Sequence, residues 1–253
     1  MTALQFRKQL RAHLRRASKR VQMFKLVGFV FIMVALAESI LAQSTNPIPK
    51  FMGRKVTLVD AGYKDEPGLF PKGPASVCVE GPPQRQCYTA KEDFGGEPTV
   101  SLVQVEKDML ALLFSAASGG VSGWAVHFAL LRPGTGNNLE DLLVGDVTVS
   151  NQNQHAFVND TSISPSPIFL IADAVWGPNE GHYGPHRFMV SAYARGISSD
   201  PDSDAYYLAD QFMTVRRYDL QEHADIITSE KQEIVARLRR VKVEMERQAG
   251  QDR

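Results

Sequence analysis

Between residues 55 and 218 the chain is a succession of short runs of β-branched and aromatic residues, each bounded by Gly, Pro, Asn or Asp. Such runs are typical of strands, because branched and aromatic side chains pack well on a pleated surface while the bounding residues favour turns. Helical periodicity is almost absent from this region. We therefore predict an all-β fold of about ten short strands. A β-sandwich is the preferred architecture, and a β-barrel is the alternative.

The expected strands follow from these runs. They comprise residues 55–59, 76–79, 86–89, 100–105, 110–116, 123–131, 147–150, 155–158, 168–174, 187–194 and 212–218. Trp124 and Phe128 share one face of their strand, so both are expected in the core. Gly119 and Gly120 predict the turn of a hairpin over residues 110–131, because glycine tolerates the positive φ of tight turns. Residues 139–143 are expected to form one short helical turn.

Both cysteines belong to this β-rich region, with Cys78 in one expected strand and Cys87 in the next. The turn Gly81-Pro82-Pro83 between them would bring the two Cα atoms to bridging distance. Outside the cytoplasm the pair is expected to form a structural disulfide, which in the chain-entropy model contributes about 2.5 to 3 kcal/mol for a loop of this length. A redox centre more often has two intervening residues, and two thiols are too few for a zinc site.

The first 42 residues have the pattern of an export signal. Eight Lys and Arg residues and no acidic residue precede the apolar run 26–37. That run is too short to span a bilayer as a helix, which needs about 20 residues. We therefore predict a signal peptide over residues 1–42 that is cleaved after Ala42, and a periplasmic or secreted protein. Met23 is a second candidate for the true start, and an uncleaved signal anchor in the membrane is the alternative.

The exported part is expected to be acidic. Removal of residues 1–42 takes away eight of the 28 Lys and Arg residues and one of the 28 Asp and Glu residues, which leaves a net charge of −7. Nucleic acids and anionic lipid surfaces are bound by Lys and Arg, so neither is expected as a main partner. Residues 43–53 are predicted to be a flexible linker, 54–219 the β-sandwich domain and 220–253 a C-terminal helix.

The C-terminal segment changes to helical periodicity. Neither Gly nor Pro occurs from Ser229 until Gly250, and Ser229 with Gln232 fits a capping box. One apolar stripe is formed by Ile234, Leu238, Val241 and Met245. Docking of this amphipathic helix on the sandwich is the preferred interpretation. The alternatives are a homodimer contact through residues 228–248 and a loose tail.

Polar and aromatic side chains are densest between two of the expected strands, in residues 173–187. A long loop carried by a rigid sheet is a common place for binding groups. The candidate ligand-binding residues are Trp176, His182, Tyr183, His186 and Arg187. The alternative interpretation is a turn shaped by Gly and Pro, whose His and Trp side chains pack on their neighbours.

The same segment also contains residue types that bind transition metals. These are Asp173, Glu180, His182 and His186. Because Gly184 and Pro185 separate the two histidines, they cannot share a helix face as in a zinc-protease motif. A divalent metal is therefore a minor hypothesis, and no cofactor is expected. Residues 200–204 begin like a calcium loop, but the Gly and the closing Glu of such a loop are absent from the positions that follow.

The sequence contains no nucleophile elbow, phosphate loop or dinucleotide fingerprint. We therefore expect an exported, non-catalytic protein that binds a small-molecule ligand or a protein partner. One alternative is a metal-dependent extracellular hydrolase that uses the four candidate metal ligands. The other is an envelope structural protein that self-associates through its C-terminal helix.

Overall fold

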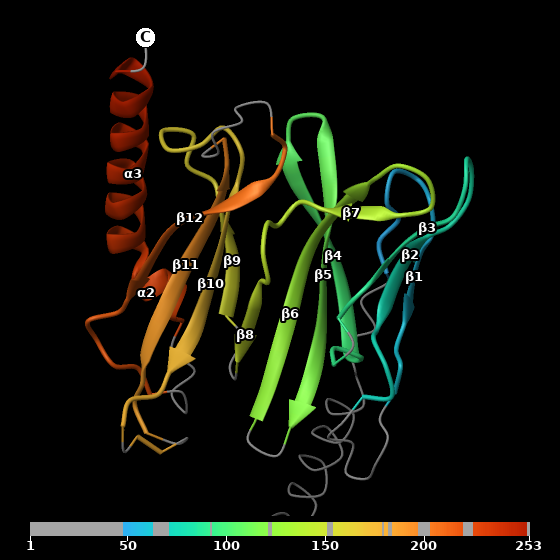
Figure 1. The fold of residues 1–253 in the computed structure, drawn as a ribbon, viewed down its shortest axis with the longest axis horizontal. Helices are drawn as coiled ribbons and strands as arrows, with labels where there is room; N and C mark the ends of the chain where they lie inside the picture. The colour runs from blue at the N-terminus through green and yellow to red at the C-terminus, as the bar shows by residue number, and fades with distance from the viewer. Residues whose placement is uncertain are drawn as a thin grey trace, which may run out of the picture. The chain divides into compact units, whose positions relative to one another are not determined.

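The computed structural model describes residues 48–62, 71–91, 93–120, 123–150, 154–178, 180–181, 184–196, 203–219 and 225–251 (Figure 1). The predicted signal peptide and residues 43–47 of the predicted linker lie outside these residues, as do His182 and Tyr183. Phe51, which falls in the predicted linker, is fully buried in the fold and exchanges two backbone hydrogen bonds with Arg54.

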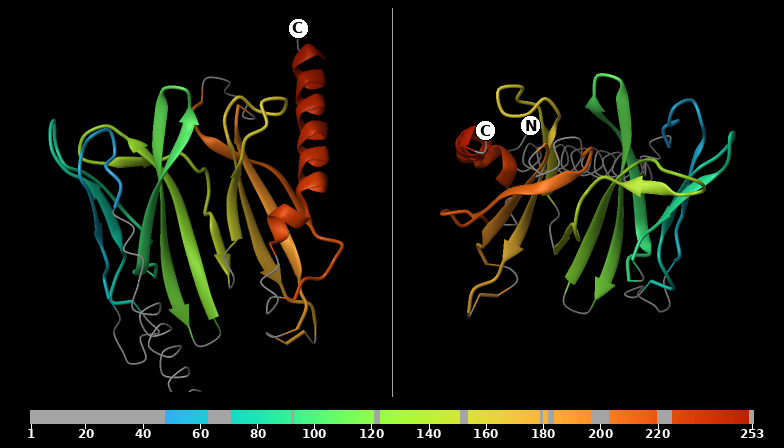
Figure 2. Two further views of the ribbon diagram at one scale, coloured as in Figure 1. Left: turned by 180° about the vertical axis from the view of Figure 1, so that it is seen from behind. Right: turned by 45° about the horizontal axis from the view of Figure 1, so that its top comes forward.

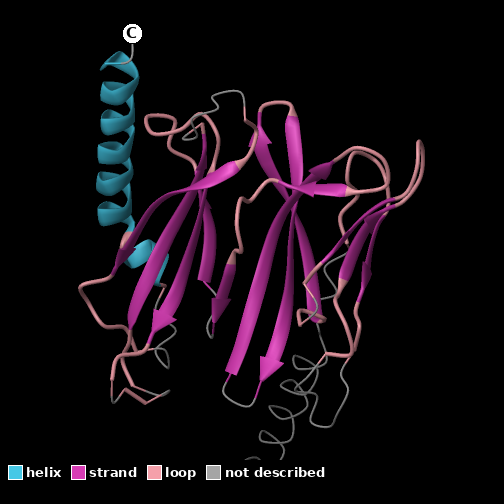
Figure 3. Ribbon diagram, in the orientation of Figure 1, coloured by secondary structure: helices cyan, strands magenta, loops and turns pink. Residues whose placement is uncertain are grey.

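The strands form three antiparallel sheets (Figure 3). The small sheet contains β1 (Val56–Val59), β2 (Ser76–Val79) and β3 (Gln86–Thr89). The central sheet contains β4 (Gly96–Glu106), β5 (Met109–Gly120), β6 (Gly123–Pro133) and β7 (Leu139–Asp141), with β8 (Thr148–Ser150) also paired to β6. The helix-covered sheet contains β9 (Gln154–Val158), β10 (Ile168–Val175), β11 (Arg187–Arg195) and β12 (Tyr206–Met213), in the order β12-β11-β10-β9.

The three sheets are stacked as layers, and the helices add a fourth layer (Figure 2). The small and central sheets enclose a core that includes Val77 and Phe114. On its other face the central sheet packs against the helix-covered sheet, where the Phe128 and Phe169 rings meet edge to face at 5.7 Å. The predicted sandwich is therefore confirmed, and the described strands do not close into the alternative barrel.

Two sheets are buried on both faces, which explains a feature of the sequence. In β10, even-numbered residues such as Leu170 face the helices, whereas Phe169 and Ile171 face the central sheet. Likewise, Leu112 and Phe114 of β5 face the small sheet, and Leu113 of the same strand faces the other way. A strand covered on both faces has a continuous apolar sequence rather than an alternating one.

The predicted hairpin and disulfide are both confirmed. β5 and β6 pair in register from Leu112 opposite Leu131 to Gly120 opposite Gly123. The two residues between these strands, 121–122, lie outside the described part of the chain. Cys78 of β2 lies directly opposite Cys87 of β3, and the two are joined by a disulfide with a Cα–Cα distance of 4.1 Å.

The C-terminal helix is confirmed as α3 (Lys231–Gln251), and it is preceded by the short helix α2 (Ile226–Ser229). The predicted capping box is wrong, because Ser229 ends α2 and Asp225 is the cap, accepting the Thr228 N–H at 2.9 Å. Among the helices of the described residues, none is long and apolar enough to cross a membrane.

Only the first half of the apolar stripe docks fully on the helix-covered sheet. Ile234 and Leu238 are buried in the core beneath α3, which confirms docking for that half. Arg237 adds a two-pronged ion pair with Asp210 of β12, at 2.6 and 3.2 Å, and lies over the Phe212 ring.

Three local predictions are wrong. Trp124 remains 44% exposed, because it lies beside the hairpin turn opposite Gly119, which has no side chain to cover it. Residues 139–143 contain strand β7 rather than a helical turn, since Leu139–Asp141 pairs with the end of β6. The last strand, β12, begins at Tyr206 and ends at Met213, rather than spanning 212–218.

Candidate functional site

Three of the predicted site residues bind one another. The indole Nε1 of Trp176 donates to Nε2 of His186 at 2.9 Å. Because an indole N–H can only donate, Nε2 is the acceptor, and the neutral imidazole carries its proton on Nδ1. That nitrogen faces Oε2 of Glu180 at 3.3 Å. We call Trp176, Glu180 and His186 the His186 network.

Further contacts hold this network in the fold. Glu180 accepts the Gly177 N–H at 2.8 Å and forms an ion pair with Arg217. The Gly177 amide, followed by His186 and Arg217, lowers the pKa of Glu180 to about 2. His186 is 0% exposed, and its backbone bonds to that of Tyr218 in both directions. Both ring nitrogens of His186 therefore already have partners within the protein.

The other predicted ligands are placed differently. Arg187 is exposed at the start of β11. Asp173 lies on the face of β10 that meets β8, where one carboxylate oxygen accepts the N–H and the hydroxyl of Ser150 at 2.9 and 2.8 Å. Burial raises the pKa of Asp173. Asp173 thus connects the helix-covered sheet to the central sheet.

Among the residues that the structure describes, no group of three or more His, Cys, Asp or Glu side chains is placed so that it could hold a metal ion. His182 lies outside this part of the chain. In the segment that begins like a calcium loop, residues 200–202 also lie outside it, and Asp204 forms ion pairs with Arg132 and Arg195.

A second polar cluster lies between the small and central sheets. His127 is 3% exposed and its Nε2 lies 2.9 Å from the Tyr88 hydroxyl. Its Nδ1 lies 3.6 Å from Asp146, which pairs with Lys91 at 2.5 Å. Burial lowers the pKa of His127 and raises that of Tyr88. A neutral imidazole with a firmly protonated phenol suits a structural link between two sheets better than proton transfer.

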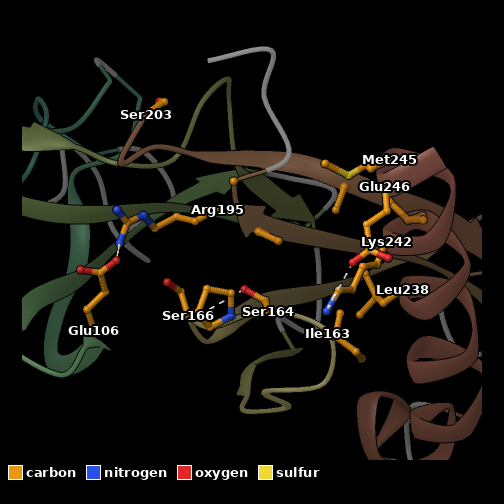
Figure 4. Close-up of a pocket in the computed structure, with 15 residues that line it drawn as sticks. Glu106, Ile163, Ser164, Ser166, Arg195, Ser203, Leu238, Lys242, Met245 and Glu246 are labelled. Atoms are coloured by element: carbon orange, nitrogen blue, oxygen red, sulfur yellow. Dashed lines mark hydrogen bonds and ion pairs between the residues drawn. The ribbon is translucent and has the colours of Figure 1, made fainter. Parts of the chain in front are cut away.

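The site that sequence reasoning missed is a groove beside α3, with a volume of about 420 Å³ (Figure 4). We call it the α3 groove. One wall is α3, which contributes Leu238 and the second half of the apolar stripe, Val241 and Met245, together with Lys242 and Glu246. The opposite wall is the loop between β9 and β10, residues 163–166. The lining is completed by the end of β11, with Ser203, Glu106 of β4 and Ala209 of β12.

Two polar contacts connect α3 to the β9–β10 loop. Lys242 Nζ donates to the carbonyl oxygen of Ser162 at 2.9 Å, and Arg239 lies 3.7 Å from the carboxylate of Asp160. The loop itself is ordered by Asp160, whose side chain accepts the Ser162 N–H at 3.0 Å. The two walls are therefore tied to each other outside the apolar part of the groove.

The end of the groove away from α3 is polar. Arg195 of β11 forms ion pairs with Glu106 and with Asp204. The buried residues Ser164 and Ser166 lie beside it, and the Ser166 N–H donates to the Ser164 hydroxyl at 3.2 Å. The α3 groove thus combines an aliphatic wall with a polar end, as ligand sites commonly do.

Comparisons with models of protein families, with curated proteins and with solved structures find no match to this chain. The class of the protein therefore rests on its own geometry. It is an antiparallel β protein of three stacked sheets, in which a C-terminal helix covers one outer face and borders a groove of ligand size.

Proposed function

We propose that this is an exported, non-catalytic protein that binds a small ligand in the α3 groove. The observation that carries the proposal is the size and lining of the groove. Its volume of about 420 Å³ falls within the usual range of ligand sites, and its lining combines seven apolar residues with seven polar or charged ones.

The His186 network is a weaker candidate for the same role. A ligand that bound His186 would have to displace Trp176 or Glu180, and the imidazole has no exposed surface. Breaking a buried hydrogen bond leaves an unsatisfied group and costs about 1 to 3 kcal/mol. The network is better suited to holding the loop, as in the alternative interpretation of the sequence.

Catalysis is not part of the proposal. The described lining of the groove includes three serines but no histidine, so none of these hydroxyls has an imidazole from that lining beside it to act as base.

Export is supported by the basic and apolar start of the sequence and by the disulfide, because disulfides persist in oxidising compartments. The periplasm and the extracellular medium are both compatible with this proposal.

Native mass spectrometry of the protein recovered from a secreting bacterium tests the proposal. The expected product begins at Gln43 and carries a small molecule. Val241→Gln should lose that molecule, because Val241 lines the groove. Val243→Gln is the matched control, since Val243 lies on the same helix but is 64% exposed outside the groove.

The other interpretations give different spectra. Stoichiometric metal would support the hydrolase, and a dimer that disappears when residues 231–251 are removed would support the self-associating envelope protein. A bound molecule that is retained equally by both glutamine variants would refute binding in the α3 groove. Retention of the N-terminal region would indicate a membrane anchor instead of cleavage.

A further inference from the structure

The non-polar lining of the α3 groove is aliphatic. Its apolar residues are Ile163, Pro165, Ala194, Ala209, Leu238, Val241 and Met245. Among the described lining residues there is no Phe, Tyr or Trp. Rings such as nucleobases are commonly held by stacking on aromatic side chains. A flexible hydrocarbon chain needs no such partner, because its burial is non-directional and proportional to area.

The charged residues of the lining are already paired. Arg195 forms ion pairs with Glu106 and Asp204, and Lys242 has the Ser162 carbonyl oxygen at 2.9 Å and Glu246 at 3.9 Å. A carboxylate or phosphate would therefore compete with carboxylates already in place around Arg195. An ammonium group would compete in the same way with Arg195 and Lys242. The lining thus favours a head group without charge.

The groove also has a direction (Figure 4). Leu238, Val241 and Met245 follow α3 over about 10 Å of helix axis, since each residue advances about 1.5 Å. Ser164 and Ser166 lie on the opposite side, near Arg195, and a serine hydroxyl can both donate and accept a hydrogen bond.

From these three features we infer that the α3 groove binds the single aliphatic chain of an uncharged amphiphile, with a hydroxyl or ester head group at the Ser166 end. A monoacylglycerol and a fatty alcohol both have this chemistry. The inference rests on the proposed function and specifies its ligand.

Isothermal titration calorimetry tests the inference. The protein without residues 1–42 is titrated with monoacylglycerols of increasing chain length, below their micelle-forming concentrations. Each added methylene should tighten binding by about fourfold until the groove is filled. The fatty acid and the alkylammonium of equal chain length should bind at least about tenfold more weakly, because each brings a charge that must lose its hydration among groups already paired.

Variants of α3 make the test specific to the groove. Val241→Gln and Met245→Gln should each weaken monoacylglycerol binding several-fold, whereas Val243→Gln should not change it. Two groove variants are used because either substitution could disturb folding, which a changed thermal transition would reveal. The variant that still folds then shows whether the groove binds the amphiphile.

The outcomes separate the inference from the proposed function. Tighter binding of the charged amphiphiles, still sensitive to Val241→Gln, would overturn the inference and leave the groove as a ligand site. The inference also fails, and the ligand site again remains, if no amphiphile binds but the molecule recovered with the wild-type protein is lost from that variant. If neither amphiphiles nor the recovered molecule respond to the groove variants, the inference and the proposed function both fail.

Discussion

Removal of the disulfide should measurably destabilise the fold. Cys78 and Cys87 are nine positions apart, so the bond closes a loop of about ten residues. The loss of loop-closure entropy from the unfolded chain then amounts to about 2.5 to 3 kcal/mol at 25 °C. For a domain of this size, each kcal/mol corresponds to roughly 2 to 4 °C in Tm. Cys78→Ala/Cys87→Ala should therefore melt about 5 to 12 °C below the oxidised wild type.

The assay is urea unfolding followed by tryptophan fluorescence, with calorimetry for Tm. Reduced wild-type protein is the control, because it lacks the bond but keeps both sulfur atoms. It should unfold at nearly the same urea concentration as the double variant. If the oxidised and reduced proteins have equal free energies of unfolding, the strand pairing of β2 and β3 does not depend on the bond, and the entropic argument is refuted.

Three further changes test other parts of the fold. Ile234→Ala should cost about 2 to 4 kcal/mol in urea unfolding, because the side chain is buried under α3, and a loss below about 1 kcal/mol would mean that the helix is not packed there. Burial raises the pKa of Asp141 to about 6, above its unfolded value of about 3.9. The free energy of unfolding is therefore highest below about pH 4 with respect to this group, and it falls as the pH rises through about 6. Asp141→Asn keeps the oxygen that accepts the Leu130 and Leu143 N–H groups and should therefore gain about 2 kcal/mol over wild type at pH 7, whereas equal stability at pH 5 and 7 in the wild type would contradict this. The pKa of Glu180 is lowered to about 2, so the ionised carboxylate stabilises the folded state above about pH 4.3, and this stabilisation is lost as the pH falls towards 2. A Glu180→Gln variant that unfolds in acid with the same pH profile as the wild type would contradict the His186 network.

Local patterns predicted most strands because short apolar runs between turn residues depend on neighbouring residues only. The runs 76–79 and 86–89 match β2 and β3 in full. β12 was placed wrongly because its position depends on a distant partner. Asp210 makes the strand polar in its middle, and this charge is balanced by Arg237 of α3. Val215, counted towards the expected strand, is 88% exposed beyond its end.

The two candidate sites also differ in whether they depend on neighbouring or on distant residues. Trp176, Glu180 and His186 are close in sequence, so their clustering could be predicted, but not the mutual hydrogen bonds that occupy the imidazole. The α3 groove could not be predicted, since its lining runs from Glu106 to Glu246 and becomes contiguous only when the sheets and α3 have packed. Its one sequence signal was that the apolar stripe of α3 continues beyond Leu238 to Met245.

Amide hydrogen exchange of the exported protein, with and without saturating monoacylglycerol, tests the central claim most directly, because it reports which of the two candidate sites is covered. We predict slower exchange on ligand binding in residues 160–166 and 238–246, with no change in residues 176–187. Slower exchange in residues 176–187 alone would contradict the account and would place the binding site in the loop around His186.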